Sequence, residues 1–492
     1  ITATSYTKAL TLTGISTDFQ ANLTATGGTG SDTLEVTSSG ANAILNLDGV
    51  TKFETLKFVD DGDATDDTMT LTTDSDLVAD GGTFTFDASG LSTDDVIISF
   101  AADTDGNNVY KGGAGVDTVT GSASDLGDNF TGGASVDIFK FATANLTSLD
   151  TIDGGAGNDQ LSMTDAATIV DADFTNVTSL EEILGADHLT VTLGALAQAA
   201  GITTLTTKSA KEGTYTLGAA YTNDISIALG ASTAKDTIDA SAYTGTLTVT
   251  GDVDLIADTD TVTGGSTGTT ILKFNGDGGT FAGSETLVTG VNKMVLDKDA
   301  DYSITTAEEH VADSATLTID ALKLTTKTLT FDGSAENDGS FIINAAGNKA
   351  HSITLGQNGD TYSSSSSAAD VVVATAGNNT ISTGDGADDI TGGTGADNIS
   401  GGAGDDIFTF VTANLDSNDT IDGGAGNDTL TMSGDGTFID ADFTNITNTE
   451  FIVGASTTTA LTATLGTKAA AAGITKFTFS DTGADGEKLT VS

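Results

Sequence analysis

A nine-residue pattern, Gly-Gly-x-Gly-x-Asp-x-apolar-x, constrains the fold of this chain more than any other feature of its sequence. It occurs six times without error, starting at Gly27, Gly112, Gly154, Gly392, Gly401 and Gly423. Degenerate copies in the same register occupy residues 123–140 and 374–391, so residues 374–409 are four consecutive nonapeptides. Because chance predicts only about 0.1 occurrences in a chain of this composition, the pattern indicates a repeat architecture.

Each nonapeptide predicts a tight turn followed by a short strand. The glycines allow positive φ and let several carbonyls point to one side, while the sixth-position Asp adds a carboxylate. The last three residues form a strand with one inward side chain. These inward residues are Leu34, Val119, Phe130, Phe139, Leu161, Ile381, Ile390, Ile399, Phe408 and Leu430. Alternating turns and strands predict an all-β parallel β-roll or β-helix solenoid, with oxygen cages along its edges that suit Ca²⁺ before Mg²⁺.

In these residues the sequence resembles the repeats-in-toxin (RTX) family of secreted calcium-binding β-roll proteins. The resemblance implies multiple Ca²⁺ ions, each between turns on the same side, so that a repeat pairs with the second repeat after it. The implied carboxylate ligands are Asp32, Asp117, Asp128, Asp137, Asp159, Asp388, Asp397, Asp406 and Asp428. The implied carbonyl ligands are Gly112, Gly113, Gly115, Gly154, Gly155, Gly157, Gly384, Gly386, Gly392, Gly393, Gly395, Gly401, Gly402, Gly404, Gly423, Gly424 and Gly426.

Three departures from the family pattern predict sites that are weak or completed by residues from elsewhere. Asn379 replaces the sixth-position Asp in the first repeat of the longer run. Ser135 replaces the fourth-position Gly near Asp137, and the repeat at Gly27 has no second nonapeptide stacked on it.

A longer duplication organises the rest of the chain. Residues 132–164 match residues 401–433 at 24 of 33 positions, and similarity continues from 171–203 to 440–475. We therefore expect a duplicated unit of about a hundred residues, made of calcium turns plus a β segment. The expected divisions are a β-rich unit with one isolated nonapeptide (1–110), a calcium-binding β-roll block (111–165), a β-rich solenoid region (166–370), a second calcium-binding block (371–433) and a β unit duplicating 165–206 (434–492).

Between the nonapeptides, period-two alternation of β-branched residues predicts further strands, for example in residues 244–256. Short helices are expected at 194–200 and 467–472, with a third within 305–314. The polar tract Ser363 to Ser367 is expected to be a loop or linker before the second block.

Composition excludes several classes of protein. The chain has no Cys, which removes disulfides and thiolate chemistry, and only three His. Its 70 acidic residues against 17 Lys and no Arg give a net charge of −53, which no nucleic acid or anionic membrane surface would attract. No apolar run is long enough for a membrane span, and the first residues lack a signal-peptide pattern. We therefore expect a processed, secreted chain whose anchor lies elsewhere.

Catalytic signals are weak. Residues 264–268 read GGSTG, but the Ser266 turn is followed by a strand, whereas a nucleophile elbow needs a helix after it and a His partner. Residues 308–310 read Glu-Glu-His without the second His of a zinc helix, so this His is expected on a helix surface. The acidic stretch 60–67 fits a solvated loop better than an ion site. We expect no enzyme activity and no catalytic residues.

The function favoured by these observations is structural. Calcium turns, strand units such as residues 239–247 and the absence of a catalytic signature resemble RTX-type surface-layer (S-layer) proteins, which leave bacteria by type I secretion and assemble in Ca²⁺. The expected partners are copies of the same chain, with a cell-surface polysaccharide reached through an anchor outside this chain. An RTX adhesin or extracellular matrix fibre remains the alternative, followed by a non-catalytic fragment of an RTX enzyme or toxin.

Overall fold

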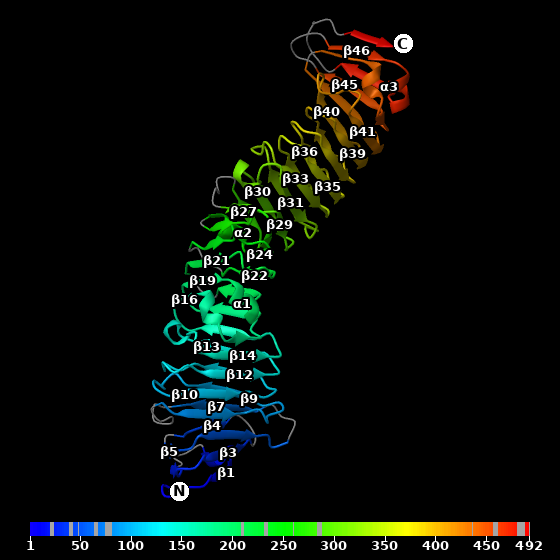
Figure 1. Ribbon diagram of the computed structural model, residues 1–492. Helices are drawn as coiled ribbons and strands as arrows, with labels where there is room; N and C mark the ends of the chain where they lie inside the picture. The colour runs from blue at the N-terminus through cyan, green and yellow to red at the C-terminus, as the bar shows by residue number, and fades with distance from the viewer. Residues whose placement is uncertain are drawn as a thin grey trace. The chain divides into compact units, whose positions relative to one another are not determined.

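The computed structural model in Figure 1 describes residues 1–19, 24–38, 43–47, 49–62, 67–73, 81–207, 211–230, 235–258, 260–282, 288–434, 436–455, 461–479 and 488–491. The chain divides into two compact units, Ile1–Leu247 and Thr248–Ser492. Each unit is a parallel β-solenoid, and the two together contain about 20 turns with about 7% helix. The all-β, parallel solenoid predicted from the nonapeptides is confirmed. Of the acidic stretch 60–67, residues 63–66 lie outside the described ranges.

The first unit has two long sheets of parallel strands. One contains β1 (Thr11–Ile15), β3 (Thr33–Thr37), β6 (Thr55–Val59), β8 (Thr83–Asp87), β10 (Asn107–Lys111), β12 (Asn129–Gly133), β14 (Thr151–Gly155) and β17 (Val177–Thr178). The other contains β4 (Ala43–Leu45), β7 (Thr68–Thr72), β9 (Asp95–Ser99), β11 (Thr118–Thr120), β13 (Ile138–Phe141), β15 (Gln160–Met163), β18 (Glu182–Gly185), β20 (Thr204–Thr207) and β22 (Ile225–Ala228). Shorter sheets contain β16 (Ala167–Ile169), β19 (Leu189–Leu193), β21 (Gly213–Leu217) and β23 (Thr237–Asp239), and β2 (Thr24–Thr26) with β5 (Gly49–Thr51).

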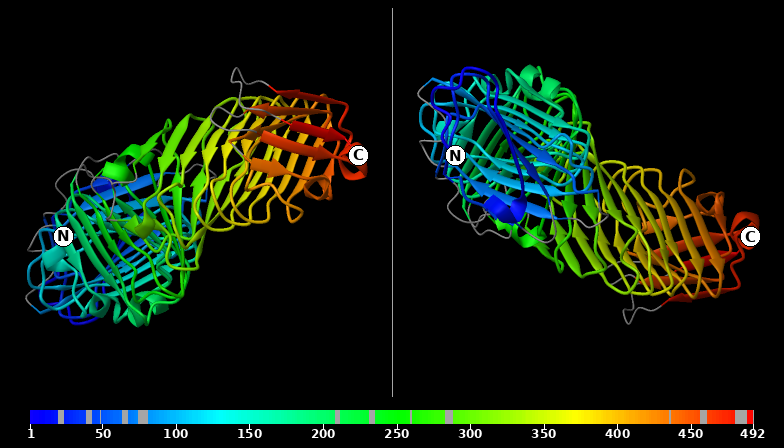
Figure 2. Two further views of the ribbon diagram at one scale, coloured as in Figure 1. Left: turned by 90° about the horizontal axis from the view of Figure 1, so that it is seen from above. Right: turned by 90° about the horizontal axis from the view of Figure 1, so that it is seen from below.

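The second unit repeats this plan, and Figure 2 shows its strands stacked as successive turns. One sheet contains β26 (Thr269–Phe274), β29 (Lys293–Leu296), β31 (Thr316–Ala321), β33 (Ser340–Ala345), β35 (Thr361–Ser366), β37 (Thr380–Gly384), β39 (Asn398–Ala403), β41 (Thr420–Ala425) and β44 (Ile446–Thr447). The facing sheet contains β27 (Gly279–Phe281), β30 (Tyr302–Thr305), β32 (Leu329–Asp332), β34 (Ser352–Thr354), β36 (Val371–Val373), β38 (Asp389–Thr391), β40 (Ile407–Val411), β42 (Thr429–Ser433), β45 (Phe451–Ala455) and β47 (Lys476–Phe479). The remaining strands are β24 (Thr246–Gly251), β25 (Thr261–Thr263), β28 (Val288–Thr289), β43 (Gly436–Phe438), β46 (Leu461–Leu465) and β48 (Lys488–Val491).

The helices are short. The α-helices are α1 (Ala195–Ala200), α2 (Val253–Asp258) and α3 (Thr467–Ala472), and the 3-10 turns are η1 (Ser16–Phe19), η2 (Thr143–Asn145), η3 (Asp171–Phe174), η4 (Glu308–His310) and η5 (Asp440–Phe443). The helices expected at 194–200 and 467–472 are thus present, whereas 305–314 forms only η4. His310 is fully buried rather than on a helix surface, because its Nδ1 accepts the backbone N–H of Ala307 at 2.9 Å and its ring lies 5.2 Å from that of Phe281.

The core is a set of ladders of apolar side chains, one from each turn. All ten predicted inward residues are at most 1% exposed. In the second unit, for example, Ile390 lies beside Phe408, which in turn lies beside Leu430 and then Ile452. A single buried residue per nonapeptide therefore suffices, because parallel stacking aligns it with the same position of the next turn.

The Ser363–Ser367 tract is not a loop, which corrects the expectation from its polarity. Residues 361–366 form β35, which pairs with β37 through Tyr362 and Ile381. Ser366 is 1% exposed, and its hydroxyl donates to the carbonyl of Lys349 at 3.1 Å. Small hydroxyl side chains fit inside the solenoid because they find backbone partners there, so polarity alone does not indicate a linker.

Candidate calcium-binding sites

Carboxylates of the second unit, three of them at the sixth position of a nonapeptide, form a ladder that joins successive turns. We call the set Asp370, Asp388, Asp406, Asp428 and Glu450 the 370–450 ladder. In each step the backbone N–H of one member donates to a carboxylate oxygen of the next. The steps are Asp370 to Asp388 (2.7 Å), Asp388 to Asp406 (2.9 Å), Asp406 to Asp428 (2.9 Å) and Asp428 to Glu450 (2.9 Å). Each step joins one turn to the next turn on the same side, and the step from Asp388 to Asp406 joins a nonapeptide to the second one after it, which is the pairing that the family resemblance implied.

The opposite edge of the same unit carries a second ladder, formed by Asp360, Asn379, Asp397 and Asp419. Its steps are Asp360 to Asn379, Asn379 to Asp397 and Asp397 to Asp419, each with a distance of 3.0 Å. Asn379 therefore holds the same place as an Asp in the hydrogen-bond pattern, although its amide carries no charge.

The first unit contains the same arrangement around the first block. The backbone N–H of Asp117 donates to Oδ1 of Asp137, and that of Asp137 donates to Oδ1 of Asp159, each at 2.8 Å. The backbone N–H of Asp159 then donates to Oε2 of Glu181 at 2.8 Å. On the other edge the backbone N–H of Asp128 donates to Oδ1 of Asp150 at 2.7 Å.

The repeat at Gly27 is not isolated, contrary to its appearance in the sequence. The strand that follows it, β3, pairs with β1 and β6. Asp32 accepts the N–H of Leu10 at 2.8 Å and donates its own N–H to Oε2 of Glu54 at 2.6 Å. The neighbouring turns lack the glycine pattern but retain the ladder.

In some of these carboxylates the second oxygen is left open to an ion, whereas Oδ2 of Asp32, Asp117 and Asp128 accepts a backbone N–H. Oδ2 of Asp137, Asp159, Asp406 and Asp428 is buried and has no hydrogen-bond partner, and all four side chains are fully buried. Leaving such an oxygen unpaired away from water is costly. Carboxylate and carbonyl oxygens are the ligands that Ca²⁺ prefers, so the donors present fit this cation.

The turn glycines leave space beside the same oxygens. A Cβ atom on Gly401 would collide with Oδ2 of Asp406, and one on Gly423 would lie 2.6 Å from Oδ2 of Asp428. Gly402 has φ of 105° and packs against the carbonyl of Gly384, a geometry that a side chain would block. Because these glycines lack a Cβ atom, backbone carbonyl and carboxylate oxygens can lie close together beside the turn.

The predicted glycines all lie in turns or at strand ends. Gly112, Gly113 and Gly115 lie between β10 and β11; Gly154 and Gly155 end β14, and Gly157 follows; Gly384 ends β37, and Gly386 follows; Gly392, Gly393 and Gly395 lie between β38 and β39; Gly401 and Gly402 are in β39, and Gly404 follows; Gly423 and Gly424 are in β41, and Gly426 follows.

Burial makes these carboxylates hard to ionise without a cation. Desolvation raises the pKa of Asp137 to about 7, and the neighbouring carboxylates of Asp117 and Asp159 add to the effect. It raises the pKa of Asp117, Asp128 and Asp406 to about 6. In the folded state without a cation, these carboxyl groups therefore take up protons at a higher pH than in an unfolded chain.

Sequence reasoning missed the ladder members that lie outside recognisable nonapeptides. These are Glu54, Asp150, Glu181, Asp360, Asp370, Asp419 and Glu450. An available signal was the buried apolar residue two positions later, such as Ile152 after Asp150 and Ile421 after Asp419. Acidic residues in that register continue the ladder even where the glycines have been lost.

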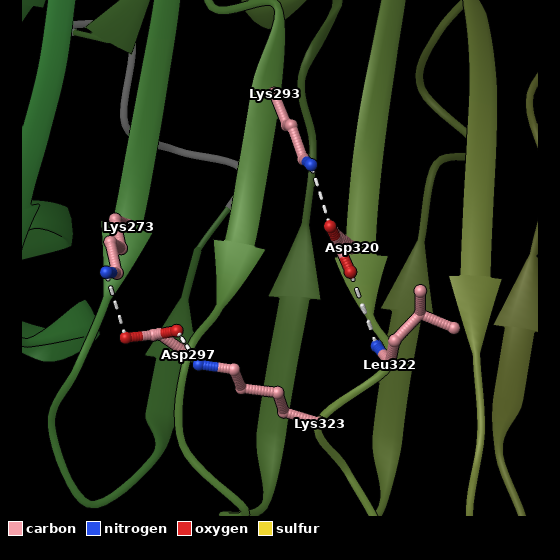
Figure 3. A network of polar contacts seen from close by, with 6 residues as sticks. All are labelled: Lys273, Lys293, Asp297, Asp320, Leu322 and Lys323. Carbon is pink, nitrogen blue, oxygen red and sulfur yellow. Dashed lines mark hydrogen bonds and ion pairs between the residues drawn. The ribbon is translucent and has the colours of Figure 1, made fainter.

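The strands before the second block balance some of their charge with lysines instead (Figure 3). Nζ of Lys273 lies 3.0 Å from Asp297, and Lys323 pairs with the same carboxylate. Nζ of Lys293 lies 2.7 Å from Asp320. Lys293 and Asp320 join β29 to β31, whereas Asp297, which follows β29, pairs with Lys273 of β26 and with Lys323 in the turn after β31. None of these pairs requires a metal ion.

A family model described as RTX calcium-binding nonapeptide repeat (4 copies) matches residues 103–139, 149–162, 364–398, 382–410 and 415–431. No curated protein and no solved structure matches the chain. Among the described residues, no helix combines the length and hydropathy needed to cross a membrane. The matched segments contain most of the ladder carboxylates described above, and repeats of this kind bind calcium, so multiple Ca²⁺ ions are expected.

Proposed function

We propose that this chain, which carries RTX calcium-binding repeats, is a non-catalytic protein that self-assembles into a surface layer outside the bacterial cell. The observation that carries the proposal is the position of the site oxygens in the wall of the solenoid. Each ladder carboxylate accepts a backbone N–H from the preceding turn, as Asp428 does from Asp406. An ion bound there links turns to one another, which is a structural role.

Calcium would make the chain fold outside the cell, where the calcium concentration is high. In low calcium the buried carboxylates repel one another, and the cost of ordering Gly-rich turns is not recovered by a thin core. Extracellular calcium modules bind with dissociation constants on the order of 10⁻⁴ to 10⁻³ M, and the binding free energy then contributes to folding. Proteins with these repeats are generally secreted, so an unfolded chain exported by type I secretion would fold on meeting external calcium.

The same cation would permit contacts between copies. A chain with net charge −53 and only 17 Lys repels its own copies unless cations shield or bridge their surfaces. We propose copies of this chain as its main partners, and a cell-surface polysaccharide bound through an anchor outside this chain.

Electron microscopy of the purified chain tests this proposal. In millimolar Ca²⁺ we expect two-dimensional sheets or regular polymers, which dissolve when a chelator is added. Monomers that persist in calcium at high protein concentration would contradict self-assembly. Monomers that bind a cell-surface ligand would instead support the adhesin alternative.

A further inference from the structure

Three acidic side chains outside every nonapeptide meet in the second unit. Glu308 lies in η4, whereas Glu336 and Asp338 lie in the turn between β32 and β33. One carboxylate oxygen from each lies within 4.8 Å of the other two. None of the ion pairs found among the described residues involves these three carboxylates.

Glu336 supplies a buried oxygen with no partner. Its side chain is fully buried, and Oε1 accepts the backbone N–H of Gly339 (2.7 Å) and that of Asp338 (3.2 Å). Oε2 is buried without a hydrogen-bond partner. Burial raises the pKa of this carboxyl, and the charges of Glu308 and Asp338 add to the effect. An acidic side chain held in this way has been removed from water without any compensating donor on its second oxygen.

The surrounding contacts hold the other two acids in place. The backbone N–H and Nδ2 of Asn337 both donate to Oε2 of Glu308, at 3.0 and 2.7 Å. The carbonyl of Asp338 accepts the N–H of Ser314 at 3.2 Å and Nδ2 of Asn358 at 2.9 Å. The cluster is thus tied to the turn before it and the turn after it.

We propose that Glu308, Glu336 and Asp338 form a calcium site that does not depend on the nonapeptide motif. Calcium–oxygen distances of 2.3–2.6 Å allow two ligands of one ion to lie up to about 5 Å apart, so oxygens within 4.8 Å of one another can share an ion. The site goes beyond the repeats and beyond the proposed surface-layer function. It would fasten η4 to the turn before β33, in the part of the unit that precedes the second RTX block.

Native mass spectrometry of the full chain in saturating Ca²⁺ tests this site, because it counts bound ions directly. Glu336→Gln and Asp338→Asn should each hold one ion fewer than the wild type. Glu309→Gln is the matched control, since Glu309 is the exposed neighbour of Glu308 and lies outside the cluster. Equal counts for all four proteins would overturn the proposal.

Two further measurements keep the result interpretable. Asp338 is exposed, so Asp338→Asn decides the question even if replacing the buried Glu336 disturbs folding. Asp406→Asn in the second RTX block should lower the count whether or not the new site exists, so failure here is separable from failure of the RTX sites. A titration with Mg²⁺ alone should leave the counts of Glu336→Gln and the wild type alike, because Mg²⁺ is reluctant to lose its water shell.

Discussion

The backbone N–H of Asp406 donates to Oδ1 of Asp428 at 2.9 Å, while Oδ2 of the same Asp428 is buried with no hydrogen-bond partner. The two oxygens of one carboxylate therefore have different roles. One completes the hydrogen bonding of the preceding turn, and the other is available to an ion. An Asn side chain can perform the first role but not the second, and this difference yields two opposite predictions.

Asp406→Asn should weaken calcium binding while preserving the ladder. The Asn side chain keeps an acceptor for the N–H of Asp388 but removes the buried charge, so stability in chelator should be unchanged or higher. The stabilisation produced by calcium should fall by about 1.4 kcal/mol for each tenfold loss of affinity. Urea denaturation with and without Ca²⁺ measures both quantities. Asp405→Asn, at the exposed neighbouring position, is the control and should behave as the wild type.

Asn379→Asp should have the reverse effect and create a calcium-dependent step. Nδ2 of Asn379 now donates to the carbonyls of Ala376 (3.0 Å) and Gly377 (3.3 Å), so the amide satisfies oxygens that an ion would otherwise bind. A carboxylate cannot make these bonds. We expect lower stability in chelator and one additional bound ion in saturating calcium. An unchanged ion count together with unchanged stability in chelator would contradict the inference that the Asn379 amide takes the place of an ion.

Gly402→Ala should destabilise the fold more than an alanine substitution at a glycine that is constrained only by its positive φ. Gly402 has φ of 105° and a Cβ there would collide with the carbonyl of Gly384. Gly81 has φ of 69°, and no atom of the described residues lies within 4 Å of a Cβ placed on it, so Gly81→Ala is the control and should cost about 1–2 kcal/mol. Thermal unfolding in calcium should show the larger loss for Gly402→Ala; equal losses would mean that the close approach of the turns is unimportant.

Without calcium, the fold should become more stable as the pH falls from 7 to 5. The pKa of Asp137 is raised to about 7 and that of Asp406 to about 6, both above the values of an unfolded chain. The folded state therefore binds more protons in this range, and its stability declines as pH rises through these pKa values. Denaturation midpoints in calcium-depleted buffer at the two pH values measure the effect. A midpoint that rises with pH would contradict it.

Lys293→Met should produce a small effect that calcium does not alter. Its ion pair with Asp320 is partly exposed, and such pairs contribute about 0.2–1 kcal/mol. A double-mutant cycle with Asp320→Asn, measured with and without Ca²⁺, should give the same coupling energy in both conditions. A coupling energy present only in calcium would indicate that this ion pair also depends on the metal.

The repeat made much of the fold predictable, because one apolar residue per nonapeptide is enough to align parallel turns. It also located Asp388, Asp397, Asp406 and Asp428, since each stands at a fixed place in a phased motif. It could not locate the cluster of Glu308 and Glu336, which are brought together by turns of irregular length. Nor could it recognise β35, because five consecutive serines carry no alternation from which a strand could be inferred.

The ladders also have a direction along the chain. Every backbone N–H in them donates to a side chain that lies 18 to 22 residues further along the chain. That of Asp370 donates to Asp388, and that of Asp406 donates to Asp428. A chain that becomes ordered from its N-terminal end therefore leaves the ladder N–H of its last ordered turn without an acceptor. A chain ordered from its C-terminal end instead leaves the carboxylate of its first ordered turn without a backbone donor, so each interrupted ladder has an unpaired N–H at one end and an unpaired carboxylate at the other.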